Sequence, residues 1–178
     1  NRGVIARSRN CGIKLSKGKW ISFLDSDDKW TEDKLKITYS AIKRNNCDVI
    51  CNNEWILKDQ NIKVWSYGPY KKNFYERMMK YGNCLSTSAS SVKKEFLKKN
   101  NIFFNEKRNF ITSEDYDFFL NIAFNNGKFF FISELLGYHY LHYQSASSKS
   151  IAHKKSTFEV LKHHVFKIQN FTENKKRL

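Results

Sequence analysis

The stretch ISFLDSDDKW, residues 21–30, places three aspartates within four positions directly after an apolar run. That run, WISFL at residues 20–24, consists of residues that favour strands and has the length of a short buried strand. In open α/β sheets, ligands bind beyond the carboxyl ends of the strands. We therefore expect Asp25, Asp27 and Asp28 to lie at a binding site.

Two explanations fit this aspartate cluster. Clustered carboxylates repel one another, so they need either a cation among them or hydrogen bonds from water and amide groups. Mg²⁺ and Mn²⁺ prefer oxygen ligands and often join a carboxylate to the phosphates of a substrate, which predicts a metal and diphosphate site. An Asx turn that prepares a helix at Thr31 explains the same residues without a ligand. The letters DSDD alone do not decide between the two.

A second acidic cluster lies at the start of a predicted helix. Ser113 is a candidate N-cap, and Glu114 and Asp115 follow it in the first turn, where the helix dipole favours negative charge. That stabilisation accounts for the two carboxylates without any function. The other explanation is catalytic, because a carboxylate held at this place can remove a proton from a hydroxyl group.

The composition predicts one globular domain with its own core. The chain has 178 residues, of which 40% are hydrophobic and 16% aromatic, and it shows no linker, repeat or low-complexity tract. The four cysteines form neither a CxxC pair nor a dense framework, so we expect reduced thiols and a cytoplasmic protein. No apolar run approaches the roughly 20 residues that cross a bilayer.

The formal net charge of +15 admits three interpretations. Nucleic acid, an anionic membrane surface and a merely solvated exterior all fit a basic chain. The lysines are scattered and no nucleic-acid motif is present, so we expect no nucleic acid as partner. Peripheral association with an anionic membrane stays as the second candidate after a solvated surface.

Helices and strands alternate through the first third of the chain, which predicts an α/β layered fold. Expected helices cover residues 4–16, 74–79, 93–99 and 157–169, and two more begin at Thr31 and Ser113. Expected strands cover residues 20–24, 48–52, 129–133 and 138–142, with edge strands between 54 and 64.

Two of these helices have a predicted apolar face. The first is expected to bury Leu35, Tyr39 and Ile42, with Trp30 and Leu35 forming a hydrophobic staple beside the Thr31 cap. The tail helix is expected to bury one side made of Phe158, Leu161, Val165 and Ile168.

Several stretches together resemble the family 2 glycosyltransferases of the GT-A fold. The resemblance begins with NRGVIARSRNCGIKLSKGKWISFLDSDDKWTEDKL, in which LDSDD matches the family's DxD motif. It continues with NCLSTSASSV at residues 83–92, with SEDYDFFLNIAFNNGKFFFISELLGYHY at residues 113–140 and with HYQSAS at residues 142–147. The order of these elements is that of the family, and they extend over residues 1–148.

The resemblance implies a fold and an activity. The fold is a mixed sheet flanked by helices, forming one partial glycosyltransferase domain over residues 1–178, with a helical tail at 149–178. The activity is inverting, metal-dependent transfer of a sugar from a nucleotide-diphosphate sugar, with UDP as the default, to a glycan or lipid-linked acceptor. The implied pathway builds a cell-surface polysaccharide such as lipopolysaccharide or capsule, at the inner face of the membrane.

The resemblance also implies roles for single residues. Asp115 is implied as the catalytic base, with Glu114 beside it placing the acceptor. Asp25 lies near the ribose or the metal, and Asp27 is the main ligand of Mn²⁺ or Mg²⁺ on the diphosphate. Three further residues are carried over from the family's motifs: Arg9 and Asn10 beside the donor, and His142 near the metal.

The sequence departs from the family at its start. Family members begin with a strand, a loop and an aspartate that reads the nucleobase, and this chain enters after those parts, so we expect an N-terminally truncated domain without the first βα units. His139 also stands where the family usually has another residue. The alternative hypothesis is a catalytically inert truncated homologue that binds a membrane or a protein partner.

Overall fold

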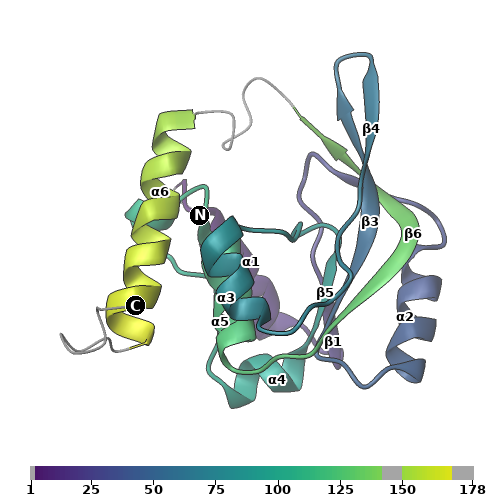
Figure 1. The fold of residues 1–178 in the computed structure, drawn as a ribbon. Helices are drawn as coiled ribbons and strands as arrows, with labels where there is room; N and C mark the ends of the chain where they lie inside the picture. Colours follow the sequence, from purple (N-terminus) through teal and green to yellow (C-terminus); the bar gives the residue numbers. More distant parts are fainter. Residues whose placement is uncertain (1–2, 142–149, 170–178) are drawn as a thin grey trace.

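The computed structural model describes residues 3–141 and 150–169 (Figure 1). Its helices are α1 (Ile5–Leu15), α2 (Lys34–Arg44), α3 (Phe74–Tyr81), α4 (Lys94–Lys99), α5 (Glu114–Phe124) and α6 (Ser150–His163), with a 3₁₀ turn η1 (Arg108–Phe110) and a π-helical segment η3 (His164–Ile168). Its strands are β1 (Trp20–Ser22), β2 (Lys29–Trp30), β3 (Val49–Lys58), β4 (Asn61–Trp65), β5 (Ser90–Lys93) and β6 (Phe129–Tyr140).

The strands form one mixed sheet in the order β1-β5-β3-β6-β2, and β4 pairs with the outer part of β3. Strands β3 and β6 are parallel, whereas the other pairs are antiparallel. The register of β3 and β6 shifts on both sides of Asn53, so the sheet is irregular at its centre. The expected α/β class with a mixed sheet is therefore confirmed.

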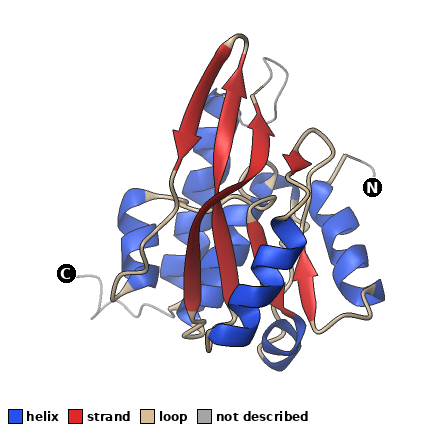
Figure 2. Cartoon of the chain, turned by 90° about the vertical axis from the view of Figure 1, so that its right-hand side faces the viewer, coloured by secondary structure: helices blue, strands red, loops and turns tan. Residues whose placement is uncertain are grey.

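Helices cover both faces of this sheet (Figure 1). Helix α2 lies on one face, where Ile50, Ile132 and Leu136 form a small core with the partly buried Ile37 and Ala41. Helices α1, α3 and α5 lie on the other face over a larger core, which includes Val49, Val92 and Phe118. Helix α6 packs outside α5. Figure 2 shows the strong twist of the long strands between these layers.

Most of the expected elements are present. The helix expected at residues 4–16 is α1, the strand at 20–24 begins as β1, and the short helices expected near residues 74 and 94 are α3 and α4. The two strands expected at 129–133 and 138–142 form one continuous strand, β6, within the described residues. All four cysteines are described, and none of them forms a disulfide.

The predicted start of α2 is wrong, and of the predicted buried face only Ile42 packs, partly buried, against the small core. Thr31 does not cap the helix, because the N-cap position is Asp33 and the Thr31 hydroxyl lies 3.4 Å from the Leu136 carbonyl. The Thr31 N–H donates to the same carbonyl at 3.1 Å and so extends the pairing of β2 with β6. The helix begins at Lys34. Leu35 and Tyr39 are 57% and 58% exposed, whereas Lys34 and Thr38 are buried.

Lys34 explains the error. Its ammonium group donates to the Asn52 side chain and to the Ala89 carbonyl, and it lies 5.4 Å from the centre of the Trp30 ring. These partners replace the water that a buried ammonium group loses. Burial lowers the pKa of Lys34 to about 8. A lysine on the inner face of a helix cannot be recognised from hydrophobic periodicity. The predicted buried face of α2 is therefore rotated about the helix axis relative to the observed one.

The buried face of the tail helix agrees with the prediction only in part. Leu161 packs partly buried against the larger core, and Val165 and Ile168 are half-buried. Phe158, however, is 64% exposed, whereas Ser156, Val160 and His164 are buried. The His164 Nε2 atom lies 3.1 Å from Asp117 of α5, and Nδ1 lies 3.1 Å from the Tyr75 hydroxyl of α3. Polar contacts of His164 therefore add to the apolar contacts of Val160 and Leu161 in holding this helix. Within the described ranges, no helix is long and apolar enough to span a bilayer.

Candidate active site

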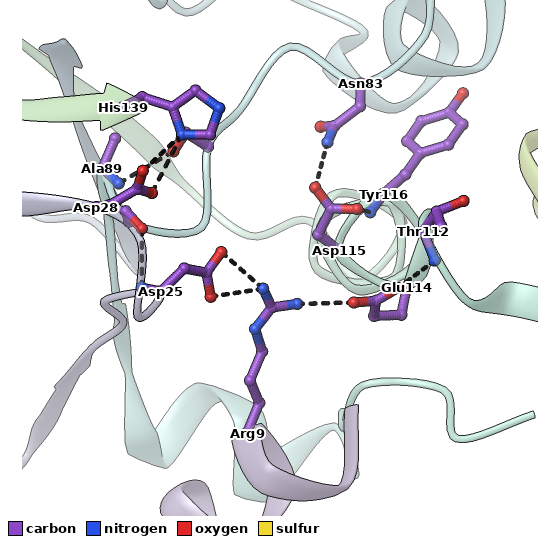
Figure 3. Close-up of polar contacts among 12 residues, drawn as sticks. Arg9, Asp25, Asp28, Asn83, Ala89, Thr112, Glu114, Asp115, Tyr116 and His139 are labelled. Atoms are coloured by element: carbon purple, nitrogen blue, oxygen red, sulfur yellow. Dashed lines mark hydrogen bonds and ion pairs between the residues drawn. The ribbon is translucent and has the colours of Figure 1, made fainter. Parts of the chain in front are cut away.

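Arg9 joins the two acidic clusters (Figure 3). Helix α1 carries its guanidinium toward the loop after β1, where Nη2 donates to both carboxylate oxygens of Asp25 at 2.7 and 2.8 Å. Its Nη1 donates to Oε1 of Glu114, the first residue of α5, at 3.0 Å. Asp25 and Glu114 are therefore held by one side chain although they lie 89 positions apart in the sequence, as their numbers show.

The Arg9 charge is stabilised in place. Its side chain is only 12% exposed, and burial by itself disfavours the charged form. The charge and hydrogen bonds of Asp25, together with the charges of Glu114 and Asp115, outweigh burial, so the pKa of Arg9 is raised above its usual value. The guanidinium remains a fixed positive charge between the clusters.

Glu114 and Asp115 differ in what surrounds them. Both oxygens of Glu114 are engaged, because Oε1 accepts from Arg9 and Oε2 accepts from the Thr112 N–H at 2.9 Å. Ser113 occupies the N-cap position as predicted, but its hydroxyl does not cap the helix and instead lies 3.1 Å from the Thr157 hydroxyl of α6. Glu114 is thus held as the partner of a cation.

Asp115 is held by weaker donors. Its Oδ2 accepts from the Asn83 amide at 2.9 Å, and its Oδ1 accepts from the Tyr116 N–H at 2.8 Å. Burial raises the pKa of Asp115 to about 6, and the neighbouring Glu114 charge adds to the rise, whereas Arg9 opposes it. A carboxylate with this pKa is ionised at neutral pH and is a stronger proton acceptor than an ordinary aspartate.

The aspartate loop, residues 25–28, is held by a hydrogen bond within itself and by hydrogen bonds to Ser88. The Asp28 N–H donates to the Asp25 carbonyl at 3.1 Å, which closes the turn, and the Asp25 N–H donates to the Ser88 hydroxyl at 3.0 Å. The Trp30 indole N–H donates to the Ser88 carbonyl at 2.8 Å. The loop is therefore anchored to the segment that leads into β5.

The Asp28 carboxylate pairs with His139 of β6. Its side chain is 2% exposed, and its oxygens lie 3.0 and 3.1 Å from His139 Nδ1. The Tyr140 N–H donates to it at 3.2 Å. Burial is the largest single effect and disfavours the Asp28 charge, but the hydrogen bonds from His139, Ser88 and the Tyr140 N–H, together with the charge of His139, outweigh it, and the pKa of Asp28 is lowered. The same bond raises the pKa of His139 despite its burial.

His139 and Asn83 are site residues that the sequence analysis missed. His139 lies 111 positions from Asp28, and Asn83 lies 32 positions from Asp115. In the sequence His139 is a departure from the family pattern, and nothing in its neighbourhood indicates a carboxylate partner. These contacts depend on the way β6 and the segment before β5 return to the site.

Asn10 is not brought to the aspartate loop. It is buried, and its amide accepts from the Phe104 N–H at 2.9 Å and donates to the Phe104 carbonyl at 2.8 Å and to Glu106 at 2.9 Å. The side chain therefore fixes the chain near residue 104 against α1. Its predicted place beside a donor stays a prediction.

Asp27 and His142 are the remaining predicted metal ligands. Asp27 is exposed, and no hydrogen bond or ion pair to another described residue engages its carboxylate. His142 lies outside the described residues. In the part of the chain that is described, no three His, Cys, Asp or Glu side chains gather as a metal site.

The model of the family described as glycosyl transferase family 2 matches residues 1–132. The chain belongs to this family. Among its relatives is the UDP-Glc:alpha-D-GlcNAc-diphosphoundecaprenol beta-1,3-glucosyltransferase WfaP of Escherichia coli, which is 34% identical over 66% of this chain and 43% of the relative. The amylovoran biosynthesis glycosyltransferase AmsB of Erwinia amylovora is 28% identical over 94% of this chain and 58% of the relative.

A solved structure supports the fold of this family member. The structure of TarS residues 1–349 from S. aureus, in complex with UDP-GlcNAc, matches with a TM-score of 0.71 at 18% identity and covers 93% of this chain and 48% of TarS. The GT-A fold implied by the resemblance is thereby confirmed. The chain spans about half the length of the relatives and of the structure that it matches.

Proposed function

We propose that the protein is an inverting, metal-dependent glycosyltransferase, which moves a sugar from a nucleotide-diphosphate sugar to a glycan or lipid-linked acceptor. The observation that carries the proposal is the bridge of Arg9 to Asp25 and Glu114, at 2.7 to 3.0 Å. This bridge holds the aspartate loop beside the start of α5. The carboxylates proposed to bind the donor and the carboxylate proposed as the base therefore lie next to each other, as the reaction requires. Membership of glycosyl transferase family 2 supports the same activity.

Asp115 is proposed as the base. It accepts the proton of the acceptor hydroxyl while that oxygen bonds to the anomeric carbon, and the bond from this carbon to the diphosphate breaks with inversion. The electron pair and the negative charge leave with the nucleoside diphosphate. A pKa of about 6 suits this role. Asn83 and the Tyr116 N–H keep the carboxylate in place, and Glu114 helps to place the acceptor through its fixed position beside it.

Asp27 and Asp25 are proposed to hold the donor side, with Asp27 as the main ligand of Mn²⁺ or Mg²⁺. The chemistry of the available oxygens fits such an ion, because the Asp27 carboxylate is exposed while Arg9 and His139 occupy Asp25 and Asp28. Mg²⁺ is usually bound through one or two carboxylates together with substrate phosphates. When bound, the ion supplies positive charge that stabilises the leaving diphosphate.

Arg9, Asn10 and His142 complete the proposed donor site. Arg9 fixes the orientation of Asp25, so this carboxylate is held in one position for contact with a ribose or with the metal. Asn10 supports the donor site indirectly, because its hydrogen bonds fix the segment near Phe104 against α1. His142 is assigned near the metal from the family motif alone.

The donor nucleotide and the acceptor class are proposed from the relatives. UDP is the expected nucleotide, since the TarS structures are in complex with UDP-GlcNAc and with UDP. The E. coli relative is named for a sugar acceptor on diphosphoundecaprenol, and the Erwinia relative for amylovoran biosynthesis. We accordingly place this protein in cell-surface polysaccharide synthesis, at the cytoplasmic face of the membrane.

Donor turnover tests the proposal. The intact protein is incubated with a panel of nucleotide sugars and Mn²⁺ or Mg²⁺, and the released nucleoside diphosphate is measured. We expect one donor to be consumed, and Asp27→Asn and Asp115→Asn each to reduce turnover at least 100-fold, the lower range of acid and base contributions. Asp33→Asn is the matched control, because that carboxylate is 69% exposed. Consumption of no donor, or equal turnover by all variants, contradicts the proposal.

A further inference from the structure

Helix α6 places four exposed side chains in one row along its outer side. Ile151, Lys155, Phe158 and Lys162 follow one another at intervals of four, three and four residues, and such intervals bring side chains onto one side of an α-helix. Ile151 is 71% exposed and Phe158 is 64% exposed, and both lysines are exposed as well. We call these four residues the outer row.

The outer row lies opposite the side of α6 that packs on the protein. Ser156, Val160 and His164 are buried, and Leu161 packs partly buried against the larger core. These positions are separated from the outer row by about half a turn of the helix. Figure 1 shows α6 on the outside of the molecule, with α5 on its inner side. The outer row therefore faces away from the core.

The apolar side chains of α6 are distributed in an unusual way. A helix on the surface of a globular protein normally turns its largest apolar side chains inward, but here Ile151 and Phe158 point outward while the small polar Ser156 is buried. A third large apolar side chain, Phe166 of η3, is 49% exposed beyond the end of the row. Exposed apolar side chains that follow one another along one helix indicate a surface that binds another body.

The charge on the same side of the helix is positive. Lys154 is exposed beside Lys155, so three lysines accompany the apolar side chains of the outer row. Glu159 is the acidic residue of α6, and its carboxylate is engaged at the flank, where it accepts from the Asn109 amide at 3.0 Å and lies 3.8 Å from the Lys162 ammonium group. The outer side of α6 thus offers apolar contact together with net positive charge.

This combination favours an anionic bilayer over a protein as the occupant. Lysines alternate with the apolar side chains along the row, so a protein that covered Ile151 and Phe158 would also have to pair the buried ammonium groups with carboxylates. A second copy of the chain would bring lysines against lysines. At a bilayer, apolar side chains enter the boundary between headgroups and acyl chains, while long lysine side chains extend to the phosphates.

We propose that the outer row is the docking surface for an anionic phospholipid bilayer. The inner side of the same helix contacts the residues just before α5. The Thr157 hydroxyl lies 3.1 Å from the Ser113 hydroxyl, and His153 Nδ1 lies 3.0 Å from the Thr112 carbonyl oxygen. A bilayer on α6 is therefore connected through this one helix to the start of α5, which carries Asp115. The inference rests on the proposed function, since a lipid-linked acceptor is presented at a membrane, and it adds the place of contact.

Vesicle sedimentation of the intact protein, without donor or acceptor, tests this inference. Vesicles of phosphatidylcholine with phosphatidylglycerol are compared with vesicles of phosphatidylcholine alone. We expect binding to the anionic vesicles, and we expect Ile151→Ser with Phe158→Ser to lower the partition coefficient about tenfold, since apolar area leaves the contact. Lys154→Gln with Lys155→Gln is expected to lower binding to anionic vesicles by about fivefold for each lysine.

The matched controls lie on the hairpin of β3 and β4, on the other side of the molecule (Figure 1). Ile62 and Val64 are 67% and 58% exposed, so Ile62→Ser with Val64→Ser removes a similar apolar surface. Lys58→Gln with Lys63→Gln removes two exposed lysines from the same hairpin. We expect both control variants to bind vesicles as the unmodified protein does. Equal losses in the α6 and hairpin variants overturn the inference, as does absence of binding to anionic vesicles.

Three further measurements separate the possible outcomes. Urea midpoints are expected to be unchanged in the α6 variants, because the substituted side chains are exposed. Light scattering that shows a dimer, dissociated by Ile151→Ser with Phe158→Ser, makes the outer row an interface between copies and overturns the membrane assignment. Transfer to a water-soluble acceptor tests the function alone, and we expect the α6 variants to keep it. A protein that consumes no donor but binds anionic vesicles through α6 contradicts the proposed function and leaves the place of contact standing.

Discussion

Asp25 receives two hydrogen bonds from Arg9, and both come from the same nitrogen, Nη2, at 2.7 and 2.8 Å. The other terminal nitrogen, Nη1, is thereby free to reach Glu114. A lysine cannot replace this planar guanidinium, because the lysine ammonium is a single point charge on a flexible chain and the two carboxylates approach Arg9 from different directions.

Removal of the Arg9 guanidinium is expected to destabilise the protein. Arg9→Ala leaves the Glu114 carboxylate, whose side chain is 7% exposed, without its cation, and loss of one partner of a buried pair costs about 3 to 5 kcal/mol. Arg7→Ala is the control on the same helix, because Arg7 pairs with Glu106 at 3.4 Å on the surface, where a pair contributes about 0 to 1 kcal/mol. Urea unfolding measures both. Equal losses would show that the bridge contributes no more than a surface pair.

The transfer rate is expected to rise with pH through about 6. Asp115 accepts a proton only when ionised, and its pKa is raised to about 6, so the rate increases up to tenfold per pH unit below this value and levels off above it.

The effect of Asp115 on folding stability has the opposite dependence on pH. The contribution of the raised pKa is full below the unfolded value of about 4 and is lost as pH rises through 6.

Asn83→Asp tests the assignment of Asp115 as the base. It places a second carboxylate 2.9 Å from Asp115, at the position of the present amide, and a like charge raises the pKa further. The rate profile is expected to shift to higher pH, whereas Asn83→Ala removes a donor without adding charge and shifts it less. A profile that does not move in Asn83→Asp would argue for another base.

The Asp28 and His139 pair is expected to stabilise the fold in a limited pH range. The His139 pKa is raised, so its contribution is present below the ordinary histidine value and is lost as pH rises through the folded value. The Asp28 pKa is lowered, so its contribution is present above the ordinary aspartate value and is lost as pH falls through the folded value. The pair therefore acts between about pH 4 and pH 6.5 at full strength.

His139→Gln measures this pair. Glutamine donates a hydrogen bond but carries no charge, so we expect a loss of unfolding free energy of about 1 to 3 kcal/mol at pH 6 and a smaller loss at pH 9. Urea midpoints across pH 5 to 9 provide the comparison. His153→Gln is the control, since His153 lies near Ser113 and Thr112 and not near a carboxylate of the aspartate loop. A loss that is the same at every pH would contradict a role for the His139 charge.

Asn10→Ala is expected to be more disruptive than its place on α1 suggests. It leaves the buried N–H and C=O groups of Phe104 without partners, and each unsatisfied buried group costs about 1 to 3 kcal/mol. Asn109→Ala, which removes an exposed contact with Glu159, is the control. Hydrogen exchange at the Phe104 amide gives a direct measurement, because that amide should exchange much faster in the Asn10 variant alone.

The sequence predicted those parts of the fold and the site whose signals are local. The strand before DSDD, the Ser113 position before α5 and most helices follow from short-range patterns and turn chemistry. The buried face of α2 did not, because Lys34 is stabilised by Asn52 and Ala89, which are distant in the sequence. His139 could not be found for the same reason, since its partner lies on a loop 111 positions earlier.

Strand β6 has a consequence for the synthesis of the chain. It pairs with β3 along one edge and with β2 along the other, yet it is the last of the three to leave the ribosome. Until Phe129 to Tyr140 have emerged, β2 lacks its partner and β3 presents an unpaired edge that includes the apolar Val49, Ile50 and Cys51. We therefore expect this edge to need protection during translation, and a product that terminates before β6 to be prone to aggregation.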